Sequence, residues 1–239
     1  CIRDRLYLCS PSNPTGYVAT RAEYQALLTL ADRYDFTIVS DECYSEIYYE
    51  ESQPSLGLLQ VCQELGRDDF SRCLVFNSLS KRSNLAGMRS GFVAGDAKLI
   101  KAFLHYRTYH GSTMPVYHQM ASAAAWRDEQ HVIANRAMYR RTFDSVLPLL
   151  NEYFDVEQPA GGLCLWLPVP DYMAMDDREF ARALYEKQAV TVLPGRFLAR
   201  DIGPDGRPAD ANTTELAVEN PGSGYLRAAL VHATEECVE

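Results

Sequence analysis

The stretch Asn-Ser-Leu-Ser-Lys-Arg-Ser-Asn-Leu-Ala-Gly-Met-Arg-Ser-Gly, residues 77–91, is the most informative part of this sequence. It sets Lys81 among small and hydroxyl-bearing residues, eight positions before Arg89. The apolar run at residues 73–76 is typical of a buried strand, and the glycines indicate tight backbone turns. A lysine at the end of a buried strand can be desolvated and become a nucleophilic amine, as Schiff-base chemistry requires. The alternative interpretation is a solvated lysine on a surface loop.

Two further motifs precede this stretch. An Asn-Pro-x-Gly sequence begins at Asn13, after the strand-like run at residues 6–9, and the apolar run at residues 36–40 leads into Asp41 and Tyr44. Asn-Pro-x-Gly by itself predicts only a turn. In this order, followed by Ser-x-Ser-Lys and the later arginine, the motifs resemble those of the fold-type I pyridoxal-phosphate (PLP) aminotransferases of class I/II. The resemblance covers essentially the whole chain.

The resemblance implies catalytic roles for three residues and a binding role for Asn13. Lys81 matches the Schiff-base lysine, which later moves a proton between the substrate α-carbon and the cofactor. Asp41 matches the aspartate that keeps the pyridine nitrogen protonated, so that the ring accepts electrons; the alternative is a carboxylate that caps a loop. Tyr44 and Asn13 match donors to the cofactor 3′-oxygen, and Asn13 is also expected to contact the substrate.

Other residues match the phosphate and substrate contacts of the family. Ser78 and Arg89 match the phosphate ligands, a hydroxyl and a charge-assisted guanidinium, and Ser80 is a weaker candidate. Arg227 lies in an apolar, strand-like run, where a charge needs a carboxylate partner. The matching arginine of the family binds the substrate α-carboxylate, and the alternative is a structural salt bridge. The glycine pair at residues 161–162 resembles a turn near the substrate, with a mostly steric role.

Composition argues against several other classes of protein. The 239 residues are 47% hydrophobic and 23% charged, the profile of a soluble globular protein, and no apolar run approaches transmembrane length. The net charge of −9 argues against a nucleic-acid or membrane partner. Seven cysteines without a Cys-x-x-Cys pair indicate reduced thiols in a cytoplasmic protein, and five histidines without zinc-ligand spacing predict no metal site.

Strand-like runs and helical stripes alternate along the chain, which predicts an α/β fold with a mostly parallel sheet. A capping box at residues 20–23 starts the first helix. Later helices are expected near residues 97–106, 115–127, 131–151 and 176–188, and later strands at residues 92–95, 163–167, 190–193 and 225–230. The family resemblance implies the PLP-dependent transferase fold of type I. We expect part of the large PLP-binding domain at residues 1–130, and a small α+β domain with its connecting helix at residues 131–239.

A family member would have a long N-terminal portion before the turn at Asn13. That portion normally supplies a phosphate loop, an aromatic residue that stacks on the cofactor, and much of the dimer contact. We therefore expect this chain to be the C-terminal part of such a protein, with an incomplete sheet, and we expect the full-length protein to be a homodimer.

Three alternatives come from other classes of protein. Ser78-Leu79-Ser80-Lys81 is formally the Ser-x-x-Lys motif of penicillin-binding proteins and β-lactamases, but Lys-Thr-Gly is absent from the chain. That serine also normally opens a helix, whereas Ser78 is expected to follow a strand. The run into Asp41 resembles a Walker B strand, but no Gly-x-x-x-x-Gly-Lys-Ser/Thr loop accompanies it. The third alternative is a regulator that keeps the PLP fold without turnover.

Within the aminotransferases, four stretches resemble N-succinyldiaminopimelate aminotransferase of bacterial lysine biosynthesis, namely residues 78–85, 106–111, 125–132 and 193–200. The resemblance implies amino transfer between glutamate/2-oxoglutarate and N-succinyl-LL-2,6-diaminopimelate. Enzymes acting on acetylornithine, aspartate or aromatic amino acids are the alternatives. Because both substrates carry a carboxylate beyond the α-position, a second cation is expected among Arg82, Arg107, Arg196 and Arg200.

Overall fold

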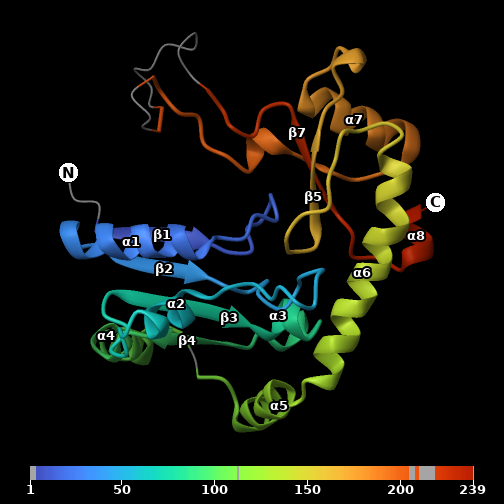
Figure 1. The fold of residues 1–239 in the computed structure, drawn as a ribbon. Coiled ribbons are helices and arrows are strands. Elements are labelled where there is room, and N and C mark those ends of the chain that lie inside the picture. Colours follow the sequence, from blue (N-terminus) through green and yellow to red (C-terminus); the bar gives the residue numbers. More distant parts are fainter. Residues whose placement is uncertain (1–3, 112, 205–207, 210–218, 239) are drawn as a thin grey trace. The chain divides into compact units, whose positions relative to one another are not determined.

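The computed structural model describes residues 4–111, 113–204, 208–209 and 219–238. The chain forms two compact units, one of Cys1–Arg140 with Ala160–Gly162 and the other of Arg141–Pro159 with Leu163–Glu239 (Figure 1). The division lies inside helix α6 (Gln130–Leu150). Across the described ranges, no helix combines the length and the apolarity needed to cross a membrane.

One sheet organises the first unit, and three of its four strands are parallel. Its order is β1 (Arg5–Cys9), β2 (Thr37–Asp41), β3 (Cys73–Ser78) and β4 (Gly91–Gly95), with β4 antiparallel to β3. This arrangement confirms the predicted α/β fold with a mostly parallel sheet. In the register, Cys9 lies opposite Asp41 and Asp41 opposite Phe76, so β1, β2 and β3 end at about the same edge.

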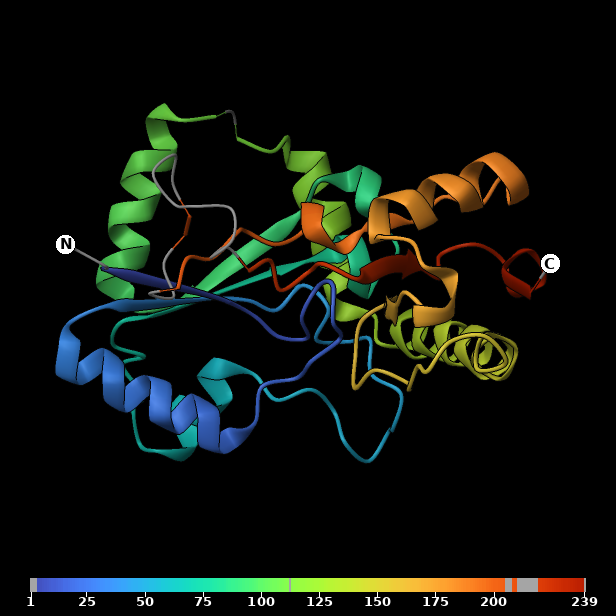
Figure 2. The same ribbon diagram turned by 90° about the horizontal axis from the view of Figure 1, so that it is seen from above.

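Helices cover both faces of this sheet. The helices α1 (Arg21–Tyr34) and α2 (Leu58–Glu64) lie on one face, and α4 (Ala97–Tyr109) lies on the other (Figure 2). Helix α1 begins with the predicted capping box, in which Thr20 Oγ1 accepts the Glu23 N–H and the Glu23 carboxylate accepts the Thr20 N–H. The core between α1, α2 and the sheet is formed by Tyr24, Leu28, Ala31, Ile38, Leu58, Val61, Cys62, Cys73 and Val75.

The segment after β3 differs from the sequence expectation. Residues 79–82, where the sequence predicts no helix, form the short helix α3 (Leu79–Arg82), followed by the 3-10 helix η1 (Ala86–Met88). Ser78 is both the last residue of β3 and the N-cap of α3, where Oγ accepts the Ser80 N–H at 3.1 Å. The expectation that Ser78 does not open a helix is therefore wrong, because a serine hydroxyl is a favoured helix cap. The case against a Ser-x-x-Lys acyl-enzyme depends on the missing Lys-Thr-Gly.

The helices α5 (Val116–Arg127) and α6 follow α4, as the sequence predicts. The second unit holds an antiparallel sheet of β5 (Cys164–Pro168), β7 (Tyr225–Ala229) and β6 (Leu193–Pro194), in that order. It also contains η2 (Asp171–Met173), α7 (Asp177–Gln188), η3 (Gly195–Phe197) and α8 (Thr234–Val238). Strand β6 is shorter and later than the strand predicted at residues 190–193. Its second residue, Pro194, has no N–H with which to extend a ladder.

Candidate active site

The carboxyl ends of β1, β2 and β3 lie next to one another. Ser10, just after β1, donates its N–H to Asp41 O at 3.0 Å, and Glu42, just after β2, donates its N–H to Phe76 O at 2.9 Å. The turn of the first motif follows the end of β1, the aspartate of the second is the last residue of β2, and the lysine of the third follows β3. Open α/β sheets bind their ligands at this edge.

Asp41 is the exposed last residue of β2. Its Oδ1 accepts the N–H of Cys43 at 3.0 Å. Both side chains, with Cys9 and Phe76, line an open cavity of about 1270 Å³ between the sheet and α4. Burial, and then the hydrogen bond to Asp41, raises the pKa of the Cys43 thiol to about 12, so this thiol stays neutral. The carboxylate of Asp41 is thus the acidic group that β2 presents to the cavity.

Lys81 lies in α3, half-buried, and approaches the turn that follows Asp41. Its Nζ lies 5.8 Å from the centroid of the Tyr44 ring. The Lys81 charge also acts on the pKa of the Cys43 thiol, in the direction opposite to the larger effect of burial. The structure therefore brings the predicted lysine, tyrosine and aspartate into one neighbourhood.

The predicted phosphate ligands lie around the start of α3. Ser78 Oγ donates to Ser90 O at 3.1 Å and lies 2.9 Å from Ser80 Oγ. Arg89, the neighbour of Ser90, is exposed and donates from Nη1 to Ala86 O at 2.9 Å. Within the described part of the chain, Arg89 forms no salt bridge with a carboxylate. The hydroxyls of Ser78 and Ser80 and the exposed guanidinium of Arg89 suit a phosphate group.

The turn that contains Asn13 is fixed by the predicted glycine pair. Gly161 donates its N–H to Gly16 O at 3.1 Å, and Gly162 donates to Ile47 O at 2.8 Å. A Cβ atom on Gly161 would lie 2.8 Å from Pro11 Cγ and 3.0 Å from Ile47 O, and Gly162 has a φ of +86°. Only glycines allow the backbone to approach this closely and in this conformation. The pair thereby joins the Asn13 turn to the segment after Asp41.

Two of the four candidate arginines for a second carboxylate are already engaged. Arg82 is buried, pairs with Glu129 and lies 5.0 Å from the Trp126 ring centroid. Arg196 donates from Nε to the buried carboxylate of Asp177 at 2.7 Å. Of the predicted set, these contacts leave Arg107 and Arg200 as the stronger candidates.

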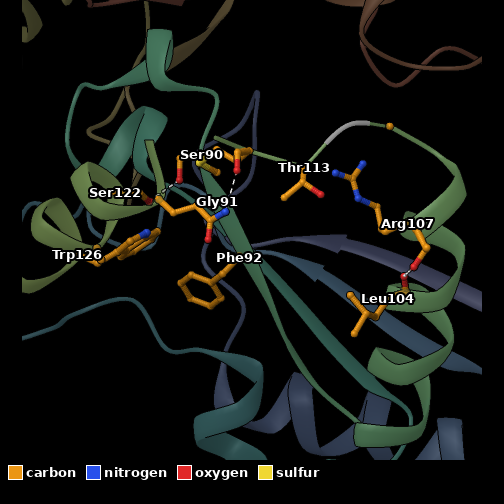
Figure 3. Close-up of a pocket in the computed structure, with 13 residues that line it drawn as sticks. Ser90, Gly91, Phe92, Leu104, Arg107, Thr113, Ser122 and Trp126 are labelled. Atoms are coloured by element: carbon orange, nitrogen blue, oxygen red, sulfur yellow. Dashed lines mark hydrogen bonds between the residues drawn. The ribbon is translucent and has the colours of Figure 1, made fainter. Parts of the chain in front are cut away.

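Arg107 lines a second cavity of about 630 Å³ in the first unit. Figure 3 shows Arg107 and Thr113 across this cavity from Ser90, Gly91 and Trp126. Arg107 Nη1 donates to the carbonyl oxygen of His110 at 3.2 Å, so the guanidinium retains further donors. The cavity adjoins the phosphate candidates through Ser90, whose carbonyl oxygen accepts the Ser78 hydroxyl.

Arg227 lies in the second unit, in the middle strand of its sheet. Its register partners are Trp166 of β5 and Leu193 of β6. Side chains two positions apart on a strand share a face, so Arg227 shares a face with Tyr225. The Tyr225 ring stacks on Trp166 with 5.2 Å between the centroids. The role of Arg227 toward a substrate stays a prediction.

Arg136 of α6, which the sequence motifs do not identify, holds the segment after Tyr44. Arg136 is buried and donates to both carboxylate oxygens of Glu51 at 3.0 and 3.2 Å. It also donates to Glu46 O at 3.1 Å and lies over the Tyr48 ring, 4.1 Å from its centroid. The sequence signal for Arg136 was a basic residue close to the apolar stripe of a predicted helix. Its partners lie too far along the chain to be read from the sequence.

The side chains at this edge of the sheet fit a PLP molecule, which needs an anion, an amine and phosphate ligands. Asp41 offers a carboxylate beside the apolar Phe76, as a protonated pyridine nitrogen requires. Lys81 supplies the amine. Ser78 and Arg89 supply a hydroxyl and a guanidinium for the phosphate.

Comparison with known proteins agrees with this fit. The chain matches the profile of the family described as aminotransferase class I and II over residues 3–219. A solved aminotransferase from Neisseria meningitidis is 51% identical, with a TM-score of 0.85, and the match covers 98% of this chain and 55% of that one. A probable N-succinyldiaminopimelate aminotransferase from Thermus thermophilus is 25% identical, with a TM-score of 0.79, and the match covers 98% and 56% of the two chains.

A curated relative is also similar in sequence. The LL-diaminopimelate aminotransferase of Dehalococcoides mccartyi is 32% identical, over 80% of this chain and 47% of that protein. The chain spans about half the length of the curated relatives it matches.

Proposed function

Because this chain belongs to the class I and II aminotransferases, we propose that the protein transfers an amino group between an amino acid and a 2-oxo acid with PLP as its cofactor. The observation that supports this most is the grouping of Asp41, Tyr44 and Lys81 at the ends of adjacent parallel strands. The carboxylate, the phenol and the amine each meet one chemical requirement of PLP catalysis. Because the three residues lie together, a chance match of the sequence motifs is a poor explanation.

The residues of this chain have distinct tasks in the proposal. When bound, PLP supplies an aldehyde and an electron-accepting ring. Asp41 holds the proton on the pyridine nitrogen, and Lys81 holds the cofactor and then carries the proton that leaves or joins the substrate α-carbon. Tyr44 and Asn13 donate hydrogen bonds to the 3′-oxygen, and Asn13 also contacts the substrate. Ser78 and Arg89 bind the phosphate.

For the substrates, we propose N-succinyl-LL-2,6-diaminopimelate with glutamate/2-oxoglutarate, the exchange used in bacterial lysine biosynthesis. The resemblance of four stretches to N-succinyldiaminopimelate aminotransferases supports this choice, as does the name of the Thermus thermophilus relative. Arg227 binds the α-carboxylate in two hydrogen bonds, since a guanidinium forms a planar fork. Arg107 or Arg200 receives the second carboxylate, because Arg82 and Arg196 already pair with acidic residues.

A homodimer in the cytoplasm is part of the same proposal. Helices α4 and α5 expose apolar side chains, among them Leu104 at 67%, Tyr109 at 78%, Val116 at 71% and Met120 at 70%. Where such groups form a contiguous patch, they mark an interaction surface. The described cysteines are unbridged, which suits a reducing compartment. Light scattering of the full-length protein should give twice the mass of one chain.

The test combines spectroscopy with an amino-acceptor panel. Full-length protein should bind PLP with the absorbance of a lysine-bound cofactor, and Lys81→Ala should abolish that absorbance and lower kcat by at least ~100-fold. Lys187→Ala, a change at an exposed lysine of α7, should leave both unchanged. The panel should contain the succinylated diacid, LL-diaminopimelate, acetylornithine, aspartate and an aromatic amino acid. A higher kcat/KM for another compound of the panel would identify that compound as the substrate in place of the succinylated diacid. PLP binding without any amino transfer would favour a regulator.

A further inference from the structure

The backbone around Lys81 depends on contacts from outside its own helix. Helix α3 has four residues, with Lys81 at its third position. The last carbonyl groups of any α-helix have no partner within the helix. In a helix this short nearly every carbonyl needs an external donor, so the direction of the Lys81 side chain depends on what surrounds α3.

Asn135 of α6 supplies those donors. Its Nδ2 donates to Lys81 O at 3.1 Å and to Arg82 O at 3.2 Å. Its Oδ1 accepts a hydrogen bond from Asn84 Nδ2, and Asn84 Oδ1 accepts one from the Tyr139 hydroxyl at 3.0 Å. A single amide therefore contacts the backbone at Lys81 and is itself held in place on its other side.

His131 contacts the same segment one helical turn earlier. Its Nε2 lies 2.8 Å from Ser83 Oγ, and its Nδ1 lies 2.8 Å from Asp128 Oδ2. Ser83 is the C-cap of α3 and donates its N–H to Leu79 O at 3.1 Å. The order Ser-His-Asp is that of a hydrolytic triad, but Ser83 is only 7% exposed, too little for a substrate to reach its hydroxyl. The three residues instead tie the end of α3 to α6.

The contacts from α6 form a regular series. His131, Asn135 and Tyr139 are four residues apart, so they lie on one face of α6. They contact Ser83, the carbonyls of residues 81–82, and Asn84, respectively. The opposite anchor is Arg82, which is buried against Trp126 and pairs with Glu129.

We propose that His131, Asn135 and Tyr139 form a positioning ridge for Lys81. The ridge holds the backbone of residues 81–84 so that the Lys81 amine stays directed toward Tyr44 and Asp41. The inference rests on the proposed function, in which this amine transfers a proton. A misplacement of about 1 Å at a reacting group can cost on the order of 100-fold in rate, so the ridge acts on catalysis without contacting substrate.

The decisive variant is Asn135→Asp in the full-length protein. Aspartate has the same shape and still accepts from Asn84, but it lacks the two N–H donors to Lys81 O and Arg82 O. Asn151→Asp is the matched control, since Asn151 Oδ1 only accepts, from the Val156 N–H at 3.2 Å. A second pair is His131→Gln, whose amide reaches as far as Nε2, and His131→Asn, which is too short to reach Ser83.

Two readouts separate the ridge from the proposed function. Amide hydrogen exchange of residues 79–85 in cofactor-free protein should rise about tenfold in Asn135→Asp and His131→Asn, with the other core peptides unchanged. In the loaded enzyme, kcat should fall ~10–100-fold while KM stays within about threefold, because positioning is lost and substrate binding is not. Asn151→Asp and His131→Gln should stay close to wild type in both.

If Asn135→Asp and His131→Asn both showed wild-type amide hydrogen exchange in residues 79–85, the positioning ridge would be overturned. An unchanged kcat of these variants in an active enzyme would overturn it as well. If the wild-type protein transfers no amino group, the proposed function fails. The exchange experiment, which needs no PLP, then still decides the ridge.

Discussion

At the scale of single residues, the proposed chemistry depends on one carboxylate at the end of β2. Asp41→Ala in the full-length protein should still bind PLP at Lys81, because the amine is unchanged. Transamination should fall by ~100–1,000-fold, the usual cost of removing an electrostatic partner of the reacting group. Absorbance titration with PLP and steady-state kinetics would measure both, with Asp144→Ala on α6 as an exposed control. Loss of PLP binding equal to that of Lys81→Ala would contradict the assigned role.

Arg227 gives a second prediction at this scale. A guanidinium matches a carboxylate with two hydrogen bonds, and an ammonium offers a compact point charge. Arg227→Lys should therefore weaken the amino donor and the 2-oxo acceptor alike, by about 1.5–3 kcal/mol, on the order of ten- to a hundredfold each. Arg182→Lys, in an exposed pair with Glu186 on α7, should change neither. Damage to only one of the two substrates would argue against a shared α-carboxylate site.

Glu42, the neighbour of Asp41, predicts a dependence of stability on pH. It is 7% exposed, and Oε1 accepts the Leu58 N–H at 2.8 Å and the Ser40 hydroxyl at 3.0 Å. Burial raises the pKa of this carboxyl, so the folded state binds its proton more tightly than the unfolded state does. Tighter proton binding by Glu42 stabilises the folded state at pH values below the ordinary glutamate pKa of about 4.3. This stabilisation is lost as the pH rises through the raised pKa of the folded state.

Glu42→Gln should therefore unfold at higher denaturant concentration than wild type at neutral pH, because glutamine keeps an acceptor and carries no charge. The difference should shrink toward zero as the pH falls below about 4.3. Urea titrations at several pH values would measure it. A variant less stable than wild type at neutral pH would show that the charged form of Glu42 is favoured after all.

At the scale of structural elements, the glycine pair predicts a steric effect. Gly161→Ala would bring a methyl group to 2.8 Å from Pro11 Cγ. Overpacking of this kind typically costs about 1–3 kcal/mol, and here the strain falls on the turn that contains Asn13. Gly87→Ala is the matched control, since a Cβ there has no neighbour within 4 Å and the residue has no positive φ. If the two variants had equal stability and equal PLP affinity, Gly161 would have no steric role.

The elements that the sequence predicted correctly are those set by local patterns. The helix α1 follows from the capping box of Thr20 and Glu23, and β2 and β3 follow from short apolar runs. Helix α3 was not predicted, since four residues are too few for a periodic pattern and its cap, Ser78, ends a strand. The predicted groups at the strand ends are found together because adjacent parallel strands end at one edge.

The supporting contacts of the site could not be predicted in this way. His131 and Ser83 are 48 positions apart, and Arg136 and Glu51 are 85 apart. Neither helix periodicity nor turn chemistry relates such residues. The apolar stripe of α6 was visible in the sequence, but the polar partners of its other positions become visible only when α6 is placed beside α3 and the segment after β2.

At the scale of the whole molecule, the two compact units differ in architecture. The first has a mostly parallel sheet covered by helices, and the second has a small antiparallel sheet. The strand-like runs beyond the long helix of residues 131–151 are the sequence feature that predicts a small α+β domain there. Helix α6 is divided between the units, with Arg136 buried in its first part and Phe143 and Val146 buried in its second.

This shared helix has a consequence for how the protein melts. Isolated helices shorter than about 12–15 residues are marginal in water, so neither half of the 21-residue α6 would persist if the unit around it came apart. Loss of order in one unit would fray the helix into the other and remove part of that unit's core. The heat capacity of the protein should therefore show one cooperative peak, and Phe143→Ala in the second unit should shift the melting of the first. Two separate calorimetric peaks would mean that α6 does not couple the units.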